Sequence, residues 1–345
     1  MSSHLFTTDD DQSTATTNRP QSDTFDFGLL FRGVIVTFGI VGILANGLVI
    51  SILASSKELN KNKLFNVLLV NQMSFDLYSS VMLVITFFFK IFPVRLKGAV
   101  GYWLCVLIYG ETILWFGLNG SMLNLAAITV ERYVKIVFST WYKKRFRAWM
   151  AYCTVAFTWL TAAAINISVS FPTSAVVKGR CWSWSIWPND AAKVSYAVLY
   201  FIFYFFNLVA IFIYCYSRIL LVVRRQARVM QGHQQQQPSC STAAQTSQSM
   251  QLKMQANVMK TVISLTLFFV VCWTPNNVYY LLQNVARVPF NYPAYYVTVS
   301  MALVNVCGNP FIYATKYEVV KNKLKKLITR VLVSSTVSIQ TGRDN

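Results

Sequence analysis

Long apolar stretches alternate with short polar connections along almost the whole chain. Seven of them reach the roughly 20 residues that a helix needs to cross a bilayer. They are residues 30–54, 64–89, 102–135, 149–171, 194–222, 258–283 and 293–314. None shows the strict alternation of a membrane β-strand. Because every backbone amide must find a partner within the segment in lipid, the pattern predicts an all-α membrane protein, a seven-transmembrane helix bundle.

Polar segments flank this predicted membrane domain, residues 29–314. Residues 1–28 are rich in Ser, Thr and Asp, and residues 231–251 are rich in Gln and Ser, so we expect both to be disordered. In residues 315–345, apolar side chains recur at helical spacing with lysines on the other face. They are Tyr317, Val320, Leu324, Leu327 and Ile328. This spacing predicts a short amphipathic eighth helix on membrane lipids, followed by a tail.

Composition and charge fix the class and the orientation. Hydrophobic residues make up 55% of the 345 residues and charged residues 12%, whereas a soluble domain carries about 25% charge. The net charge of +19 does not indicate a nucleic-acid partner, because the Lys and Arg residues lie between the spans. One set of connections, with the C-terminal tail, holds 21 of them and the opposite set 9. The excess predicts that the N-terminus lies outside and the C-terminal tail in the cytoplasm.

Polar side chains inside the predicted spans are candidates for function, because a charge at the bilayer centre costs several kcal/mol. Asp76 lies midway along the second span, and Ser121, Asn305 and Asn309 lie on the third and seventh spans. A carboxylate surrounded by amides and hydroxyls suits a sodium ion. It suits a structural hydrogen-bond network equally well, and both interpretations stay open on spacing alone.

Two prolines inside the spans and a charged tripeptide at the end of the third span are further candidates for function. Pro275 and Pro310 lie deep in the sixth and seventh spans, and each is expected to kink its helix. The kink is either a hinge or only a structural bend. Glu131-Arg132-Tyr133 ends the third span. Taken alone, this arginine is a residue at the membrane interface.

Taken together and in order, these motifs resemble the rhodopsin-like (class A) G-protein-coupled receptors over about residues 28–328. The matching positions are Asn46, Asp76, Glu131-Arg132-Tyr133, Trp159, Phe269 with Cys272-Trp273-Thr274-Pro275, and Asn309-Pro310 with Tyr313. The resemblance implies a multi-pass receptor of the plasma membrane with an extracellular N-terminus, and not an enzyme. Such a receptor binds an extracellular ligand and activates a heterotrimeric G protein, with arrestin as a further partner.

The same resemblance assigns roles to single residues. It implies an allosteric sodium ion at Asp76, Ser121, Asn305 and Asn309, and no other cofactor. Arg132 becomes the switch that contacts the G protein. The remaining switch residues it implies are Glu131, Tyr133, Tyr216, Phe269, Trp273, Pro275, Pro310 and Tyr313.

The resemblance also implies a disulfide between Cys105 and Cys181. Cys105 lies two residues further from Arg132 than the family spacing, so we expect a bulge or irregular turn between them.

The chain departs from the family pattern at three further positions. Leu208 replaces the usual proline of the fifth helix, Met122 stands where isoleucine is common, and Gln255 replaces a glutamate that locks the arginine in some members.

The ligand is only partly defined. Leu303 stands where opsins carry the retinal lysine, and Leu114 where amine receptors carry an aspartate, so retinal and monoamines are disfavoured. The candidate pocket residues are Glu111, Asn276, Asn277, Tyr280, Asn284, Tyr296 and Ser300. Glu111 is equally well explained as a partner of Lys90. The basic outer loops either favour an acidic ligand or are neutralised by the five aspartates of residues 1–28, and we expect a peptide. A transporter or channel is the alternative function.

Overall fold

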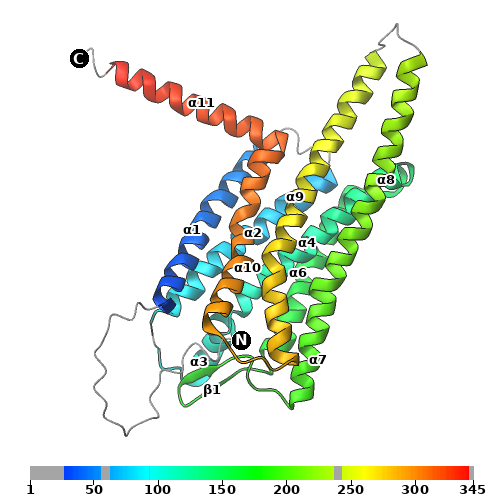
Figure 1. Ribbon diagram of the computed structural model, residues 1–345. Coiled ribbons are helices and arrows are strands. Elements are labelled where there is room, and N and C mark those ends of the chain that lie inside the picture. Colours follow the sequence, from blue (N-terminus) through cyan, green and yellow to red (C-terminus); the bar gives the residue numbers. More distant parts are fainter. Residues whose placement is uncertain (1–26, 56–62, 93, 237–242, 342–345) are drawn as a thin grey trace.

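Seven long helices form one bundle in the computed structural model, which describes residues 27–55, 63–92, 94–236 and 243–341 (Figure 1). The first two helices are α1 (Phe27–Ala54) and α2 (Lys63–Phe89). The third comprises α3 (Gly98–Leu104), the π-helical turn η3 (Cys105–Tyr109) and α4 (Thr112–Val137). The short α5 (Ser139–Arg145) leads to the fourth, α6 (Ala148–Ser170).

The second half of the chain completes the bundle. A hairpin of β1 (Ala175–Val177) and β2 (Arg180–Trp182) precedes the fifth helix, with Val176 opposite Cys181. That helix comprises α7 (Asp190–Tyr200), the π-helical η4 (Phe201–Phe206) and α8 (Asn207–Gln236). Then come α9 (Ala243–Val285), α10 (Tyr292–Lys316) and α11 (Glu318–Thr341). Each of the seven predicted spans coincides with a helix long and apolar enough to cross a membrane.

The distribution of side chains is the reverse of that in a soluble protein. Leu44 and Leu160 are exposed at 69% and 70% on the outside of the bundle, whereas Asp76 and Asn124 are fully buried inside it. Exposed apolar and buried polar residues are stable together only where lipid surrounds the bundle. The central helix is α4, which packs against α2, α6, α8 and α9.

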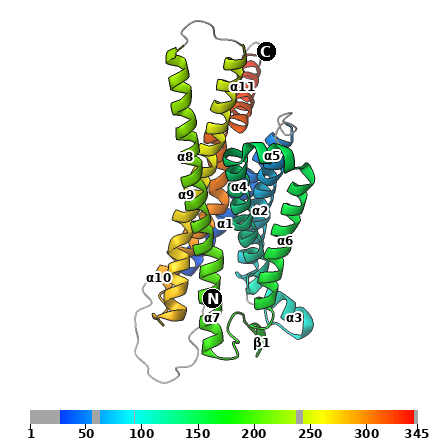
Figure 2. The same cartoon turned by 90° about the vertical axis from the view of Figure 1, so that its right-hand side faces the viewer.

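The two ends of the bundle differ, and we name them after residues that lie there. The Cys105 end carries α3, the hairpin and the start of α7, and the Arg132 end carries α5 and α11 (Figures 1 and 2). In Figure 1, α11 turns away from the bundle axis at its junction with α10, where Tyr317 leaves helical geometry.

Two sequence predictions need correction at the Arg132 end. Residues 231–236 and 243–251 were expected to be disordered, but they continue α8 and α9 as helix, while residues 237–242 lie outside the described part of the chain. Gln, Met, Lys and Ala are good helix formers, and extending an existing helix needs no new nucleus. The amphipathic eighth helix is not short: α11 has 24 residues and includes most of the expected tail.

The inner part of α11 is anchored on the bundle. Tyr317 and Val320 are buried in the core, whereas Leu327 and Ile328 are about half exposed. Lys323 Nζ donates to the Ser55 carbonyl oxygen at 2.6 Å, at the end of α1. The start of α11 is therefore docked, and its apolar face continues beyond the bundle. The predicted N-terminal segment, residues 1–28, lies outside the described residues except for Phe27 and Gly28, which begin α1.

Candidate functional site

A cavity of about 520 Å³ opens at the Cys105 end between α4, α6, α7, α9 and the residues after the hairpin. Its wall is made mainly of amide side chains and aromatic rings. Five of the seven predicted pocket residues line it, namely Glu111, Asn276, Asn277, Tyr280 and Asn284. Their role in binding stays a prediction, but the structure brings them to one wall.

The other two predicted pocket residues do not line this cavity. No described residue of α10 does. Tyr296 packs on α1 instead, where its ring stacks on Phe31 at 4.4 Å between centroids, and Ser300 lies further along the same helix, partly buried. The Tyr296 side chain therefore faces α1 and not the cavity, a rotation that the sequence pattern alone does not specify.

The wall also holds residues that the sequence analysis missed. Trp115 and Asn119 follow Glu111 at intervals of four residues, so all three lie on one face of the third helix. That spacing was a usable signal. Asn166, Tyr196 and Tyr200 carry no comparable signal, because their burial against the cavity depends on how α6 and α7 pack.

Glu111 is the most connected residue of the wall. It has a left-handed backbone, with φ of 61°, between η3 and α4. Its carboxylate forms a buried ion pair through Oε1 with Lys90, the residue that follows α2, and Oε2 accepts a hydrogen bond from Trp115 Nε1 at 3.1 Å. Glu111 therefore combines both roles considered for it: it pairs with Lys90 and also faces the cavity. Lone pairs remain on both oxygens for a ligand.

The expected disulfide joins Cys105 to Cys181. The extra residues between Cys105 and Arg132 are taken up by the π-helical turn, which Gly110 N closes by donating to the Cys105 carbonyl oxygen at 2.7 Å. The predicted irregular turn is confirmed. Trp184 Nε1 donates to the Gly110 carbonyl oxygen at 3.0 Å. The disulfide and this indole together hold the hairpin and the following loop against the cavity.

A buried polar cluster surrounds Asp76, deeper in the bundle. Ser121 Oγ donates to Asp76 Oδ1 at 2.7 Å, and Asn309 Nδ2 donates to Asp76 Oδ2 at 2.8 Å. Asn305 does not reach the carboxylate, because its Oδ1 faces Trp273 Nε1 at 3.4 Å. The cluster also contains Gln72, which the sequence analysis missed although it lies one helical turn before Asp76.

The donor chemistry of this cluster fits a small hard cation. Asp76 is fully buried, and no described Lys or Arg forms an ion pair with it. Its two oxygens, the Ser121 hydroxyl and the nearby Asn305 amide provide the oxygen ligands that hard cations prefer. Asn305 Nδ2 is buried and has no hydrogen-bond partner among the described residues. The structural network is present too, since Asn71, Gln72 and Asn124 bond to one another or to Ser121.

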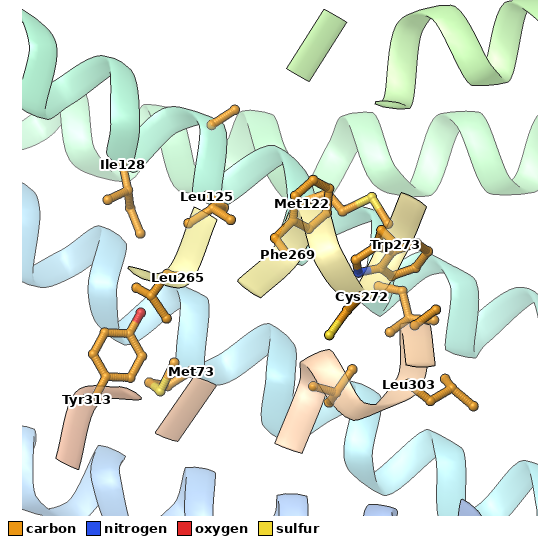
Figure 3. Packing of buried hydrophobic residues seen from close by; sticks show 14 of the residues in the cluster. Met73, Met122, Leu125, Ile128, Leu265, Phe269, Cys272, Trp273, Leu303 and Tyr313 are labelled. Carbon is orange, nitrogen blue, oxygen red and sulfur yellow. The ribbon is translucent and has the colours of Figure 1, made fainter. Parts of the chain in front are cut away.

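The switch residues form a chain of contacts towards the Arg132 end. Trp115 on the cavity wall meets Trp273 edge to face, with centroids 6.1 Å apart, and Trp273 lies 6.1 Å from Phe269. Figure 3 shows Met122, Phe269 and Trp273 in one buried cluster, with Tyr313 towards its far end beside Met73. Pro275 and Pro310 lie within α9 and α10, which both continue past them.

Arg132 contacts Glu131, its neighbour on α4, and Phe65 of α2. Its Nε donates to Glu131 Oε2 at 2.5 Å, and Tyr142 of α5 donates to Glu131 Oε1 at 2.6 Å. The guanidinium lies over the ring of Phe65 at 3.8 Å from the centroid. The Tyr133 hydroxyl lies 3.4 Å from that of Tyr214.

The resemblance implies that Tyr216 and Tyr313 meet near Arg132 in the active state. In the described part of this structure, neither tyrosine forms a hydrogen bond with Arg132. The Tyr216 hydroxyl bonds to Thr266 and Thr129 at 2.7 and 3.1 Å. The Tyr313 hydroxyl is buried without a hydrogen-bond partner among the described residues. The side chain of Gln255 lies outside the described residues. This arrangement keeps the arginine on α4, where the closed state of the expected switch would have it.

Comparisons with known proteins agree with this geometry. Residues 45–313 match the model of the 7 transmembrane receptor (rhodopsin family). The chain therefore belongs to this family, and it is a multi-pass plasma-membrane receptor of the G-protein-coupled class. The alternative of a transporter or channel is not favoured.

Individual relatives are distant. The chain is 25% identical to galanin receptor type 1 of Rattus norvegicus over 289 residues, 81% of this chain and 77% of that one. It is 24% identical to somatostatin receptor type 3 and 28% to lysophosphatidic acid receptor 3, both of Mus musculus, over 88% and 95% of this chain and 69% and 88% of theirs. Squid rhodopsin shares the fold at a TM-score of 0.70 and 21% identity, over 93% and 92% of the two chains.

Proposed function

We propose that this receptor binds the end of an extracellular peptide in the cavity at the Cys105 end and activates a heterotrimeric G protein at the Arg132 end. The single observation that carries the proposal is the contact chain from the cavity wall to the core, in which Trp115 meets Trp273. In this proposal the N-terminus is extracellular, as the 21 to 9 distribution of basic residues favours, and the chain has no enzymatic activity.

The wall of the cavity supports a peptide over a lipid. Seven of its side chains are amides, which both donate and accept hydrogen bonds as peptide groups do. They are Asn119, Asn166, Asn189, Asn276, Asn277, Gln283 and Asn284. Asn276 Oδ1 is buried with no partner in the described part of the chain, so it is ready to accept an N–H from a ligand. Galanin and somatostatin receptors are peptide receptors, and the lysophosphatidic acid receptor is a lipid receptor.

The charge around the cavity favours an acidic group on that peptide. Among the described residues, five exposed basic side chains of the Cys105 end form no salt bridge. They are Arg95, Lys97, Lys178, Arg180 and Lys193, of which Lys193 lines the cavity. Complementary charge speeds association and selects partners. The cavity volume, within the 300–1,000 Å³ that small ligands occupy, admits only the end of a peptide.

Activation is then a shift between two conformations. A ligand against Trp115 repositions Trp273, α9 moves outward at the Arg132 end, and Arg132 leaves Glu131 and Phe65 to contact the G protein. Arrestin competes for the same opened end. The lysines of α11 lie on anionic lipid. A sodium ion held by Asp76 and Ser121, with Asn305 and Asn309 beside them, supplies a positive charge that neutralises the buried carboxylate and stabilises the closed state.

The test is G-protein activation in cells that carry energy-transfer sensors for a panel of Gα subunits. Peptide libraries with and without acidic residues are compared with lipid and small-anion libraries. We expect acidic peptides to be the active class, and the Arg132→Ala variant to be silent at equal surface level. Activation by lipids alone would replace the peptide proposal. Ion or solute flux without nucleotide exchange would contradict the receptor function itself.

A further inference from the structure

Gln72 is a buried polar residue that none of the recognised motifs includes. It lies on α2 one turn before Asp76 and is 1% exposed. Its Nε2 donates to Ser121 Oγ at 2.5 Å, and its Oε1 accepts from Asn124 Nδ2 at 2.9 Å. Asn124 Nδ2 also donates to the Leu68 carbonyl oxygen at 2.9 Å, so Asn124 keeps a partner without Gln72. The Gln72 amide also interacts with the Asp76 carboxylate. Among the described residues, Gln72 alone donates an amide hydrogen to Ser121 Oγ.

That contact occupies an oxygen that a cation needs. A serine hydroxyl has one hydrogen and two lone pairs. In this structure the hydrogen points to Asp76 Oδ1 and one lone pair accepts the Gln72 amide hydrogen. A single lone pair of Ser121 remains for an ion. Asp76 Oδ2 already accepts an amide hydrogen from Asn309. Two amide groups thus direct their positive ends at the oxygens of the proposed sodium site.

We propose that Gln72 sets the sodium affinity of this pocket by competing with the ion for Ser121 Oγ. The inference rests on the proposed sodium site at Asp76. The Gln72 amide supplies part of the electrostatic compensation that a cation supplies, so it lowers the gain from binding the ion. Sodium consequently stabilises the closed state of this receptor less than it would in the same pocket without the Gln72 amide.

The test measures unfolding of the purified full-length receptor in lipid nanodiscs. Sodium chloride replaces choline chloride at constant ionic strength, and the unfolding midpoint is followed against sodium concentration, because an ion that binds only the folded state raises the midpoint. Gln72→Met keeps an unbranched side chain of similar length and removes the amide. Gln72→Leu serves as a second variant if Met packs poorly.

We expect the sodium concentration for half-maximal stabilisation to fall about 2- to 10-fold in Gln72→Met, the change that corresponds to the loss of one competing hydrogen bond. Line broadening of ²³Na resonance gives an independent readout. Ser74→Ala is the matched control on the same helix, since among the described residues the Ser74 hydroxyl bonds only to the Val70 carbonyl oxygen of its own helix. Asp76→Asn should remove the sodium response in every background.

Each outcome decides the proposal. A sodium response that appears or strengthens only when Gln72 is replaced supports it. An unchanged or weaker response in Gln72→Met and Gln72→Leu overturns it and leaves the sodium site standing. No response in the wild type or in any variant removes both the sodium site and this inference. G-protein activation by the receptor is judged separately and is unaffected by that result.

Discussion

The contact between Arg132 and Phe65 allows the closed state to be tested without any ligand. The guanidinium lies 3.8 Å from the centroid of the Phe65 ring, and both side chains are buried. Phe65 also meets Tyr317 edge to face, at the junction of α10 and α11. The chain has Gln255 where a glutamate locks the arginine in some relatives. We therefore predict that Phe65 carries much of the restraint on Arg132, and that Phe65→Leu raises basal activity.

The magnitude follows from the contact. A cation–π interaction contributes about 0.5–1 kcal/mol when exposed and about 2 kcal/mol when desolvated. Arg132 Nη2 is buried with no hydrogen-bond partner among the described residues, so the desolvated value applies. Losing about 2 kcal/mol from the closed state raises the ratio of open to closed receptor by roughly 30-fold. Leucine keeps most of the apolar volume, so the bundle should still fold.

The assay is guanine-nucleotide exchange on purified heterotrimeric G proteins, with the receptor in nanodiscs and no ligand added. Phe87→Leu is the matched control, because Phe87 is also buried on α2 and lies under the Lys90 ammonium, 5.2 Å from it, at the opposite end of the bundle. We expect basal exchange to rise in Phe65→Leu and not in Phe87→Leu. Equal rates in wild type and Phe65→Leu, or equal rises in both variants, would refute the reasoning.

Three further predictions concern the Cys105 end. Glu111→Gln removes the negative charge that pairs with the buried Lys90 ammonium and should cost about 3–5 kcal/mol of stability in thermal unfolding. The double variant Lys90→Met, Glu111→Gln should recover most of this loss, and a double variant as unstable as the single one would contradict the ion pair's role. Replacing Cys105 and Cys181 together by serine should cost about 2–5 kcal/mol, and an unchanged midpoint would show that the hairpin is held by other contacts. Trp184→Phe removes one hydrogen bond and should lower the stability by only about 1 kcal/mol, but it should weaken the potency of peptides in the Gα sensor assay. Full potency would show that this loop is not part of the binding site.

Much of the fold could be predicted because the bilayer leaves few choices. A stretch of apolar residues in lipid must be helical, so the seven spans followed from length and hydropathy. The helix ends were less predictable. The Gln- and Ser-rich composition of residues 231–251 indicated disorder, but α8 and α9 extend into this segment from helices that are already formed.

The residues of the candidate site could be predicted where the order of the motifs identified them. They could be predicted less well where the rotation of a helix decides which side chains face the site. The disulfide between Cys105 and Cys181 was implied by the family resemblance, and the irregular turn followed from a two-residue excess over the family spacing. Tyr296 was predicted to line the pocket because of its position along α10, but its ring stacks on Phe31 of α1. Asn305 faces Trp273 rather than Asp76. Which side of a helix meets a cavity depends on packing against its neighbours, which a single sequence does not encode locally.

The central claim is that a ligand at the Cys105 end controls Arg132 at the other end. The most direct test compares wild type and Arg132→Ala at equal surface level, with acidic peptides applied to cells that carry the panel of Gα sensors. The account predicts a peptide-dependent signal from one or more Gα subunits in the wild type and none in the variant. A peptide that activates both proteins equally would contradict it.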